Sequence, residues 1–176
     1  MLLACVAIFG AGPVGLLALQ SAHLFGPSRI YMVDRVGYRL ELAEQMGAIP
    51  VNLDKGDPAQ QLRSLTGGRG PDAVLECVGH EVPFAQALVA VRPGGTVSSV
   101  GVYVEDAIGF PVRDAFFKDL TLRMGICNAR NYITPLMGLV EAGRLDPSVS
   151  SPTRWRPPRP PRATRSSTAR RIAPSR

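Results

Sequence analysis

The chain is poor in the residues that build metal sites and disulfide frameworks. It holds only three cysteines and two histidines in 176 residues. Cys5, Cys77 and Cys127 are odd in number, far apart and without a C-x-x-C pair, so neither a disulfide framework nor a zinc knuckle is expected. This cysteine usage fits a reducing, cytoplasmic setting. His23 and His80 have no Cys or Glu at ligand spacing, which indicates surface or capping roles.

Long uninterrupted hydrophobic runs are also absent. The most apolar stretch, MLLACVAIFGAGPVGLLAL, has no basic segment before it, and its glycines and proline interrupt it before it could span a bilayer. We therefore expect a soluble chain without a signal segment and without a membrane role. The 45% hydrophobic content and the length suit one domain with a sizeable core.

Acidic residues are missing from the last part of the chain. Residues 150–176 carry eight arginines and no Asp or Glu, whereas residues 1–149 carry all fourteen acids and twelve basic residues. The formal charge of +6 therefore comes from the tail, and nothing in the body indicates a specific nucleic-acid surface. Prolines and arginines without apolar periodicity cannot build a core. We predict a folded domain over 1–149 and a disordered basic tail over 150–176.

Short apolar runs alternate with amphipathic segments throughout the predicted domain. Strands are predicted at 4–9, 29–34, 48–52, 71–79, 96–102 and 120–126, and helices at 13–24, 38–47, 57–65, 84–95 and 132–145. This β-α-β alternation predicts right-handed crossovers and a parallel sheet. The expected fold is α/β, a Rossmann doubly wound six-stranded parallel sheet with helices covering both faces.

A glycine-rich loop connects the first predicted strand to the first helix. Its sequence, Gly10-Ala11-Gly12-Pro13-Val14-Gly15, matches G-x-G-x-x-G, and Asp34 ends the next strand about twenty residues later. The pattern is weak alone, but this context favours a dinucleotide site. Gly10 allows a tight turn, Gly12 leaves room for a pyrophosphate, and Gly15 permits close packing of helix and strand.

The type of nucleotide can be argued from the same residues. The helix amino terminus offers free N–H groups to phosphates. Asp34 can accept hydrogen bonds from ribose hydroxyls and would repel a 2′-phosphate, which favours NAD over NADP. An S-adenosylmethionine-dependent methyltransferase is an alternative, because such enzymes also have a glycine loop and often a turn like Pro93-Gly94-Gly95. The G-x-G-x-x-G spacing suits a diphosphate better. A glycine turn that binds no ligand is the remaining alternative.

Five segments in order carry a family resemblance: VAIFGAGPVGLLALQSA, VDRVGYRLELAEQMGA, GPDAVLECVG, VRPGGTVSSVGVY and LVEAGRLDPS. Over residues 4–148 they resemble the cofactor domain of the zinc-dependent medium-chain alcohol and polyol dehydrogenases. The resemblance implies that Arg39 contacts the adenosine ribose. It also implies that the backbone at Val100, Val102 and Gly125 to Cys127 holds the nicotinamide carboxamide, and that the sixth strand forms a homodimer.

Members of that family place the zinc ligands, the proton relay and the substrate pocket mainly in a domain that precedes the cofactor domain. No residue here matches those groups, so no catalytic or metal-binding residue is predicted, and zinc is expected only in a complete enzyme. The resemblance thus implies the NAD(H)-binding part of an alcohol dehydrogenase-like oxidoreductase, inactive alone, that pairs with a separate catalytic domain or comes from a disrupted gene. The alternative class is a non-redox binding module whose basic tail contacts nucleic acid or an acidic partner.

The tail itself departs from the family pattern. After GRLDPS, the family usually continues with a strand, a Thr-His pair and a helix that contains tyrosine. Synonymous GC-rich codons for residues 150–176 permit a translation with those features in another frame, which shows compatibility only. We therefore expect a reading-frame shift, and the gene sequence decides between it and a tail selected for binding.

Overall fold

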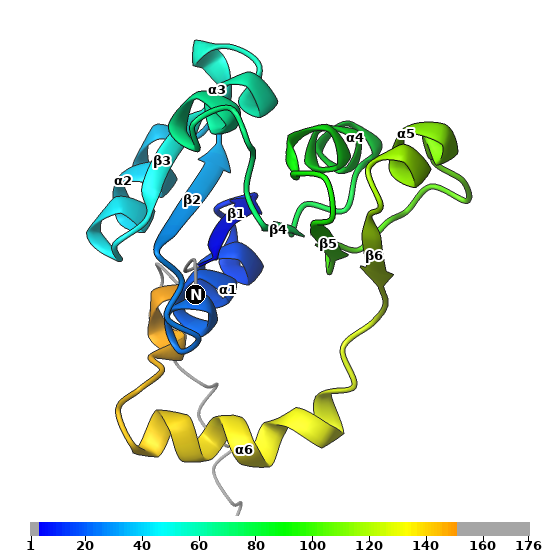
Figure 1. Ribbon diagram of the computed structural model, residues 1–176. Coiled ribbons are helices and arrows are strands. Elements are labelled where there is room, and N and C mark those ends of the chain that lie inside the picture. The colour runs from blue at the N-terminus through cyan, green and yellow to red at the C-terminus, as the bar shows by residue number, and fades with distance from the viewer. Residues whose placement is uncertain (1–3, 151–176) are drawn as a thin grey trace, which may run out of the picture.

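A single parallel sheet of six strands forms the centre of the computed structural model, which describes residues 4–150 (Figure 1). The spatial order is β3-β2-β1-β4-β5-β6. The strands are β1 (Cys5–Phe9), β2 (Arg29–Asp34), β3 (Ile49–Asn52), β4 (Ala73–Glu76), β5 (Thr96–Ser99) and β6 (Thr121–Met124). The strand order reverses between β1 and β4, where open sheets of this kind bind ligands. The predicted doubly wound Rossmann sheet is confirmed.

Helices follow the strands as the sequence predicted, with one addition. They are α1 (Pro13–His23), α2 (Gly37–Gln45), α3 (Pro58–Leu65), α4 (Glu81–Ala90), α5 (Val112–Phe117) and α6 (Ala129–Glu141), with short 3-10 turns η1 (Leu53–Lys55) and η2 (Pro147–Ser150). Helix α5 was not predicted, because six residues are too short to show helical periodicity. Strands β4 and β5 end three residues earlier than predicted. The N–H groups of Val100 and Gly101 both donate to the carbonyl oxygen of Glu76, which ends the regular pairing of the two strands.

The face of the sheet that α3 and α4 cover holds the larger core. Leu62 of α3 and Phe84 of α4 pack with Phe9, Tyr31 and Val74 of the sheet, and all five are fully buried. Alternate residues of each strand point to this face, as the period of two requires. Burial of such side chains from water is the main stabilising contribution to the domain.

The opposite face is covered by α1 and α2 over β1, β2 and β3. Leu16, Leu19 and Leu40 of these helices pack with Ile8 and Met32 of the sheet. The start of α1 is thereby fixed against the carboxyl end of β1. This packing places the glycine-rich loop at the edge of the sheet where the strand order reverses.

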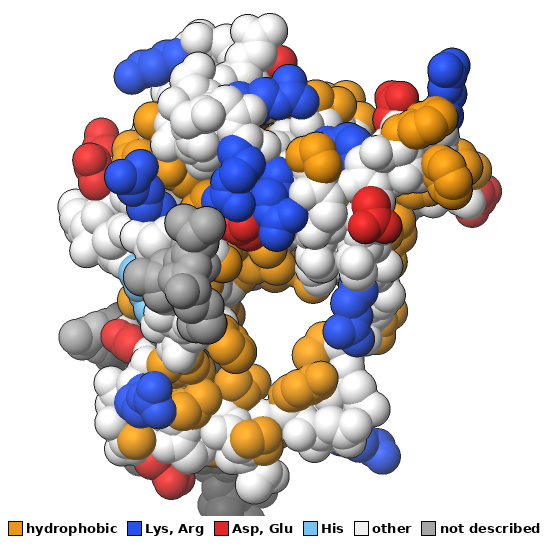
Figure 2. Space-filling model, in the orientation of Figure 1, with side chains coloured by type: hydrophobic (Ala, Val, Ile, Leu, Met, Phe, Trp, Pro, Cys, Tyr) orange, Lys and Arg blue, Asp and Glu red, His pale blue; other side chains and the backbone are white. Residues whose placement is uncertain are grey.

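Coverage of this second face is incomplete beyond β1. Helix α6 stands away from the sheet (Figure 1) and has no buried residue. An apolar hollow of about 620 Å³ lies beside α1, β1 and β4 and includes Val6, Ala18, Phe25 and Leu75. Figure 2 shows an opening in this region bordered by hydrophobic side chains. Within residues 4–150, helices therefore cover both faces of the sheet only on the β1–β3 side, which is less than the alternation predicted.

Across residues 4–150, no helix is both long and apolar enough to cross a bilayer. The predicted disorder of the basic tail and the reading-frame shift fall on residues 151–176, which lie outside the described part of the chain.

An ionic cluster joins the amino ends of β1 and β4. The Asp72 carboxylate accepts hydrogen bonds from Arg69 at 2.7 and 3.0 Å, from Arg92 Nε at 2.7 Å and from the Cys5 N–H at 2.8 Å. Partial burial opposes ionisation of Asp72, but these donors outweigh it and hold the pKa of Asp72 well below its ordinary value.

Replacing Asp72 with Asn is expected to lower the free energy of unfolding at pH 7 by about 1–3 kcal/mol, since charge-assisted bonds are lost. The pKa of Asp72 in the folded state lies below its unfolded-state value of about 3.9, so ionised Asp72 stabilises the fold at neutral pH. That contribution declines as the pH falls from about 5 through the folded-state pKa. Urea unfolding at pH 7 and pH 3.5 measures it, with exposed Asp106→Asn as the control. A difference that does not shrink at low pH would contradict the ionic origin.

Candidate functional site

The glycine-rich loop leaves β1 in a sharp turn. Gly10 has φ +95°, a conformation that side chains rarely adopt, and its N–H donates to the Val33 carbonyl oxygen at 2.8 Å. Helix α1 begins with Pro13 at its first turn, and its N-cap residue Gly12 makes no side-chain capping bond. The N–H groups of this first turn lack helical partners by geometry, so they are available to an anion at the sheet edge.

Gly12 and Gly15 differ in the space around them. A Cβ atom built at Gly12 meets nothing within 4 Å, whereas one at Gly15 would overlap the carbonyl oxygen of Gly10. Gly15 was predicted to allow packing of helix and strand. The structure shows that its closest approach is to the loop itself, with the Ile8 side chain next at 3.7 Å. The position of a Gly12 side chain is thus open to solvent, whereas the position of a Gly15 side chain is occupied by the backbone of Gly10.

Asp34 closes β2 and is largely buried, with 8% of its surface exposed. Its Oδ2 accepts the Ala11 N–H at 2.7 Å, and its Oδ1 accepts the N–H groups of Arg35 and Val36 at 2.7 and 2.9 Å. A carboxylate offers about four acceptor positions, so Oδ2 retains capacity for one further donor. Asp34 can therefore accept a hydrogen bond from a ligand hydroxyl. It also holds the glycine-rich loop in place through the Ala11 N–H, and the sequence did not reveal this second role.

A groove of about 930 Å³ brings part of the predicted site together. Gly10, Gly12, Asp34 and Arg39 all line it. Further lining residues come from η1, the N-cap of α3 and the loop after β4: Leu53, Asp54, Asp57, Val78 and His80. Of these, the sequence had singled out only His80, as a surface or capping residue. Arg39 is exposed, and its Nε lies 3.3 Å from the Tyr38 hydroxyl; this hydrogen bond raises the pKa of Arg39.

The other predicted residues share the carboxyl edge of the sheet but do not line this groove. Pro13 and Val14 are exposed in the first turn of α1, and Gly15 is buried behind them. Val100 and Val102 follow β5 and are 43% and 74% exposed. Gly125 and Cys127 follow β6 and are also exposed. The structure thus gathers the residues expected at the adenosine end and leaves those expected at the nicotinamide end on open loops.

Sequence reasoning missed a buried carboxylate at the end of β4. Glu76 is 0% exposed, and its four hydrogen-bond donors come from Val78, Gly79, Ser99 and Tyr103. Burial and the bond to Glu76 raise the pKa of Tyr103 to about 12, so Tyr103 keeps its proton at neutral pH. A signal was present, because the acid closes the run AVLE as Asp34 closes RIYMVD.

The two histidines occupy the capping and surface positions that the sequence indicated. His80 is the N-cap of α4 and accepts the Val82 N–H at Nδ1, while exposed His23 lies 2.9 Å from the Met46 carbonyl oxygen. Cys77 packs against the core beneath α1 and α2, and burial raises the pKa of its thiol to about 12. Among residues 4–150, no cluster of three His, Cys, Asp or Glu side chains could hold a metal ion. The described residues do not fit a zinc site.

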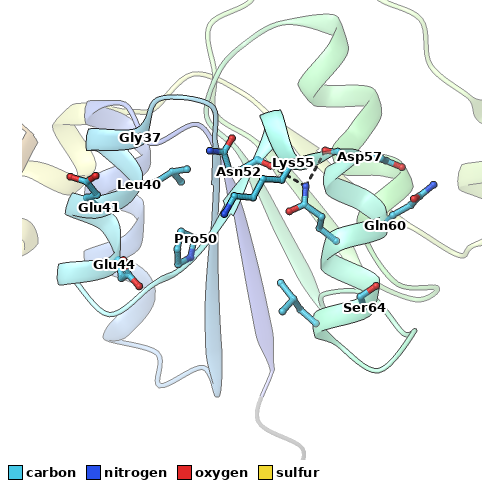
Figure 3. Close-up of a pocket in the computed structure, with 13 residues that line it drawn as sticks. Gly37, Leu40, Glu41, Glu44, Pro50, Asn52, Lys55, Asp57, Gln60 and Ser64 are labelled. Atoms are coloured by element: carbon cyan, nitrogen blue, oxygen red, sulfur yellow. Dashed lines mark hydrogen bonds between the residues drawn. The ribbon is translucent and has the colours of Figure 1, made fainter.

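A second groove of about 690 Å³ lies outside the edge strand β3, between α2 and α3 (Figure 3). Glu41 and Glu44 line the α2 wall, and Gln61 bridges the carbonyl oxygens of Asn52 and Gly56 at 3.0 Å. This groove shares only Gly56 and Asp57 with the first one.

Comparisons with known proteins agree with this geometry. Residues 13–142 match the sequence model of the zinc-binding dehydrogenases. The chain is 40% identical over 141 residues to a "Probable zinc-binding alcohol dehydrogenase" of Mycobacterium tuberculosis, covering 80% of this chain and 36% of that protein. It is 37% identical over 143 residues to L-threonine 3-dehydrogenase of Bacillus velezensis, covering 80% of this chain and 41% of that protein.

Solved structures show the same fold. Alcohol dehydrogenase from Thermus sp. ATN1 superposes with a TM-score of 0.79 and 45% identity, covering 82% of this chain and 42% of that one. The structure of a "putative zinc-binding dehydrogenase" from Sinorhizobium meliloti, bound to NADP, has a TM-score of 0.74 at 24% identity, which supports the fold alone. The match covers 85% of this chain and 49% of that one. The chain therefore spans less than half the length of the relatives it matches.

Proposed function

The chain belongs to the zinc-binding dehydrogenase family, and from this premise we propose that it is the NAD(H)-binding part of an alcohol dehydrogenase-like oxidoreductase. The carrying observation is the groove at the carboxyl ends of β1, β2 and β4, where Gly12 leaves open space beside the free N–H groups of α1. The family match decides against the methyltransferase alternative. The binding-module alternative depends on the tail, which lies outside the described residues.

Each part of the groove fits one part of a dinucleotide. The first turn of α1 suits the pyrophosphate, because its N–H groups and helix dipole favour anions. Asp34 suits the adenosine ribose through the remaining capacity of Oδ2, and Arg39 borders the same region. The cofactor would supply hydride acceptance, and these residues would bind and orient it.

We expect the chain to bind NADH at least about tenfold more tightly than NADPH. Asp34 is held in place by three backbone N–H groups, so its carboxylate cannot easily turn away from a 2′-phosphate. Isothermal titration calorimetry with both nucleotides measures the ratio, and AMP against 2′-phospho-AMP tests the ribose position alone. Equal affinity, or tighter binding of NADPH, would refute the role proposed for Asp34.

We propose that alcohol oxidation needs a bound zinc ion and a substrate pocket, which residues 4–150 do not supply. Zinc acts as a Lewis acid on the alcohol oxygen in such chemistry, and residues 4–150 do not fit a zinc site. We propose that a separate catalytic domain provides these groups, consistent with the greater length of the relatives. The isolated chain should give no zinc-dependent formation of NADH from a panel of alcohols, followed at 340 nm. Turnover that survives stringent purification would contradict this proposal.

We also propose a homodimer through β6. This strand is an edge of the sheet, and unpaired N–H and C=O groups at an edge favour pairing with another strand. Exposed Met124 and Ile126 lie on or beside it, and Phe116 and Phe117 of the adjoining α5 are also exposed. Burial of these side chains would add hydrophobic stabilisation to strand pairing. Light scattering across a concentration series checks the assembly state.

A further inference from the structure

The loops that follow β4 and β5 meet at one buried side chain. Each oxygen of the Glu76 carboxylate accepts two hydrogen bonds. Oε1 accepts the N–H groups of Val78 and Gly79 at 2.7 and 2.9 Å. Oε2 accepts the hydroxyls of Ser99 and Tyr103 at 2.8 and 2.7 Å. All four acceptor positions of the carboxylate are therefore used, two by the loop after β4 and two by the end of β5 and the loop that follows it.

The main chain of Glu76 joins the same two loops. Its carbonyl oxygen accepts the N–H groups of Val100 and Gly101 at 2.9 and 3.1 Å. The loops also touch backbone to backbone, because a Cβ atom at Gly79 would overlap Val102 and one at Gly101 would overlap Gly79. The ring of Tyr103 packs edge-on against Phe84 of α4, with centroids 6.1 Å apart. The spacing of the two loops is thus set by contacts that converge on Glu76.

These loops border the two ends of the proposed cofactor site. Val78 and His80 line the groove, whereas Val100 and Val102 lie beyond it, where the nicotinamide is expected. We infer that Glu76 is a positioning residue that holds the loop at Val100–Val102 against the loop at Val78–His80, and so controls how the nicotinamide end of the dinucleotide is bound. This inference rests on the proposed NAD(H)-binding function.

A buried carboxylate is a costly way to fill space. Moving a charged group from water into the protein interior costs free energy unless hydrogen bonds compensate. Here the compensating donors are two backbone N–H groups and two hydroxyls, all of them neutral. A carboxylate can accept from four donors at once, which a hydrophobic side chain cannot do. The arrangement therefore suits a residue that fixes loop geometry.

The test compares NADH with ADP-ribose, which lacks the nicotinamide, as ligands of the full 176-residue chain. Tyr103→Phe removes one donor but keeps the ring that packs on Phe84. Glu76→Gln keeps an oxygen for the two N–H donors, and Glu76→Ala leaves all four donors without their acceptor. Tyr132→Phe, on exposed α6, is the matched control. Calorimetry gives both dissociation constants, and the emission of bound NADH reports the environment of the nicotinamide.

We expect Tyr103→Phe to reduce the preference for NADH over ADP-ribose by about five- to tenfold, while the ADP-ribose affinity changes less than about twofold. Glu76→Ala should remove more of the preference than Glu76→Gln, and NADH emission should shift in the same order. If Glu76→Ala does not fold, the two milder variants decide. Equal weakening of both ligands, or an unchanged preference, would overturn the positioning role. Failure of the unmodified chain to bind either ligand would overturn the proposed function itself.

Discussion

Alanine at Gly12 is expected to weaken NADH binding by about tenfold to a hundredfold and to leave the fold intact. Gly12 has φ −76° and ψ −174°, which an alanine adopts without strain, and its Cβ would meet no atom within 4 Å. The methyl group would occupy the open space proposed for the pyrophosphate. As an N-cap, alanine should cost no more than about 1 kcal/mol of stability.

Calorimetry and urea unfolding measure the two effects separately. Gly37→Ala is the matched control, because Gly37 also has open space for a Cβ and does not line the candidate groove. It should bind NADH as the unmodified chain does. If Gly12→Ala bound NADH with unchanged affinity, the pyrophosphate would have to lie elsewhere.

Replacing Gly15 with alanine is expected to destabilise the fold, whereas the Gly12 substitution is expected to weaken binding. The free energy of unfolding should fall by at least about 3 kcal/mol, which approaches the stability of many small domains. The added Cβ would overlap the Gly10 carbonyl oxygen. That backbone cannot easily shift, because the Gly10 N–H is bonded to Val33 and the Ala11 N–H to Asp34. Relief of the overlap would require α1 to separate from the loop.

Thermal and urea denaturation of Gly15→Ala, compared with Gly12→Ala, check this expectation. Both variants add one methyl group to the same G-x-G-x-x-G segment, so the comparison isolates the effect of where that methyl group lies. A loss below about 1 kcal/mol at Gly15 would show that the loop and α1 can move apart at little cost. Similar stabilities for the two variants would contradict the distinction between the glycines.

Local patterns were sufficient for most of the architecture. The runs ACVAIF and RIYMVD are apolar and short, which is typical of strands buried on both faces, and glycine and proline mark the ends of the elements around them. The glycine loop was recognisable because it stands between such a strand and a helix. Helix α5 was missed, since VRDAFF is too short for a helical period and none of its residues is buried.

The site was predictable only in part. Gly12 and Asp34 could be assigned from their places in the chain, because the turn after a strand and the end of the next strand meet at one edge of a parallel sheet. Three hydrogen bonds from the N–H groups of Ala11, Arg35 and Val36 use three of the acceptor positions of the Asp34 carboxylate. The bond from Ala11 joins residues 23 positions apart in the chain. Such long-range bonds leave no periodic trace in the sequence.

The sequence by itself determined the alternation of strands and helices, the glycine loop and the family, because these depend on residue order within short windows. Only the tertiary structure decided that Gly15 faces the loop backbone, that Glu76 joins two loops, and that α6 stands away from the sheet. Each of these depends on which surfaces meet after the chain has crossed the sheet several times. Contacts between distant segments are set by packing in three dimensions, and residue spacing along the chain does not encode them directly.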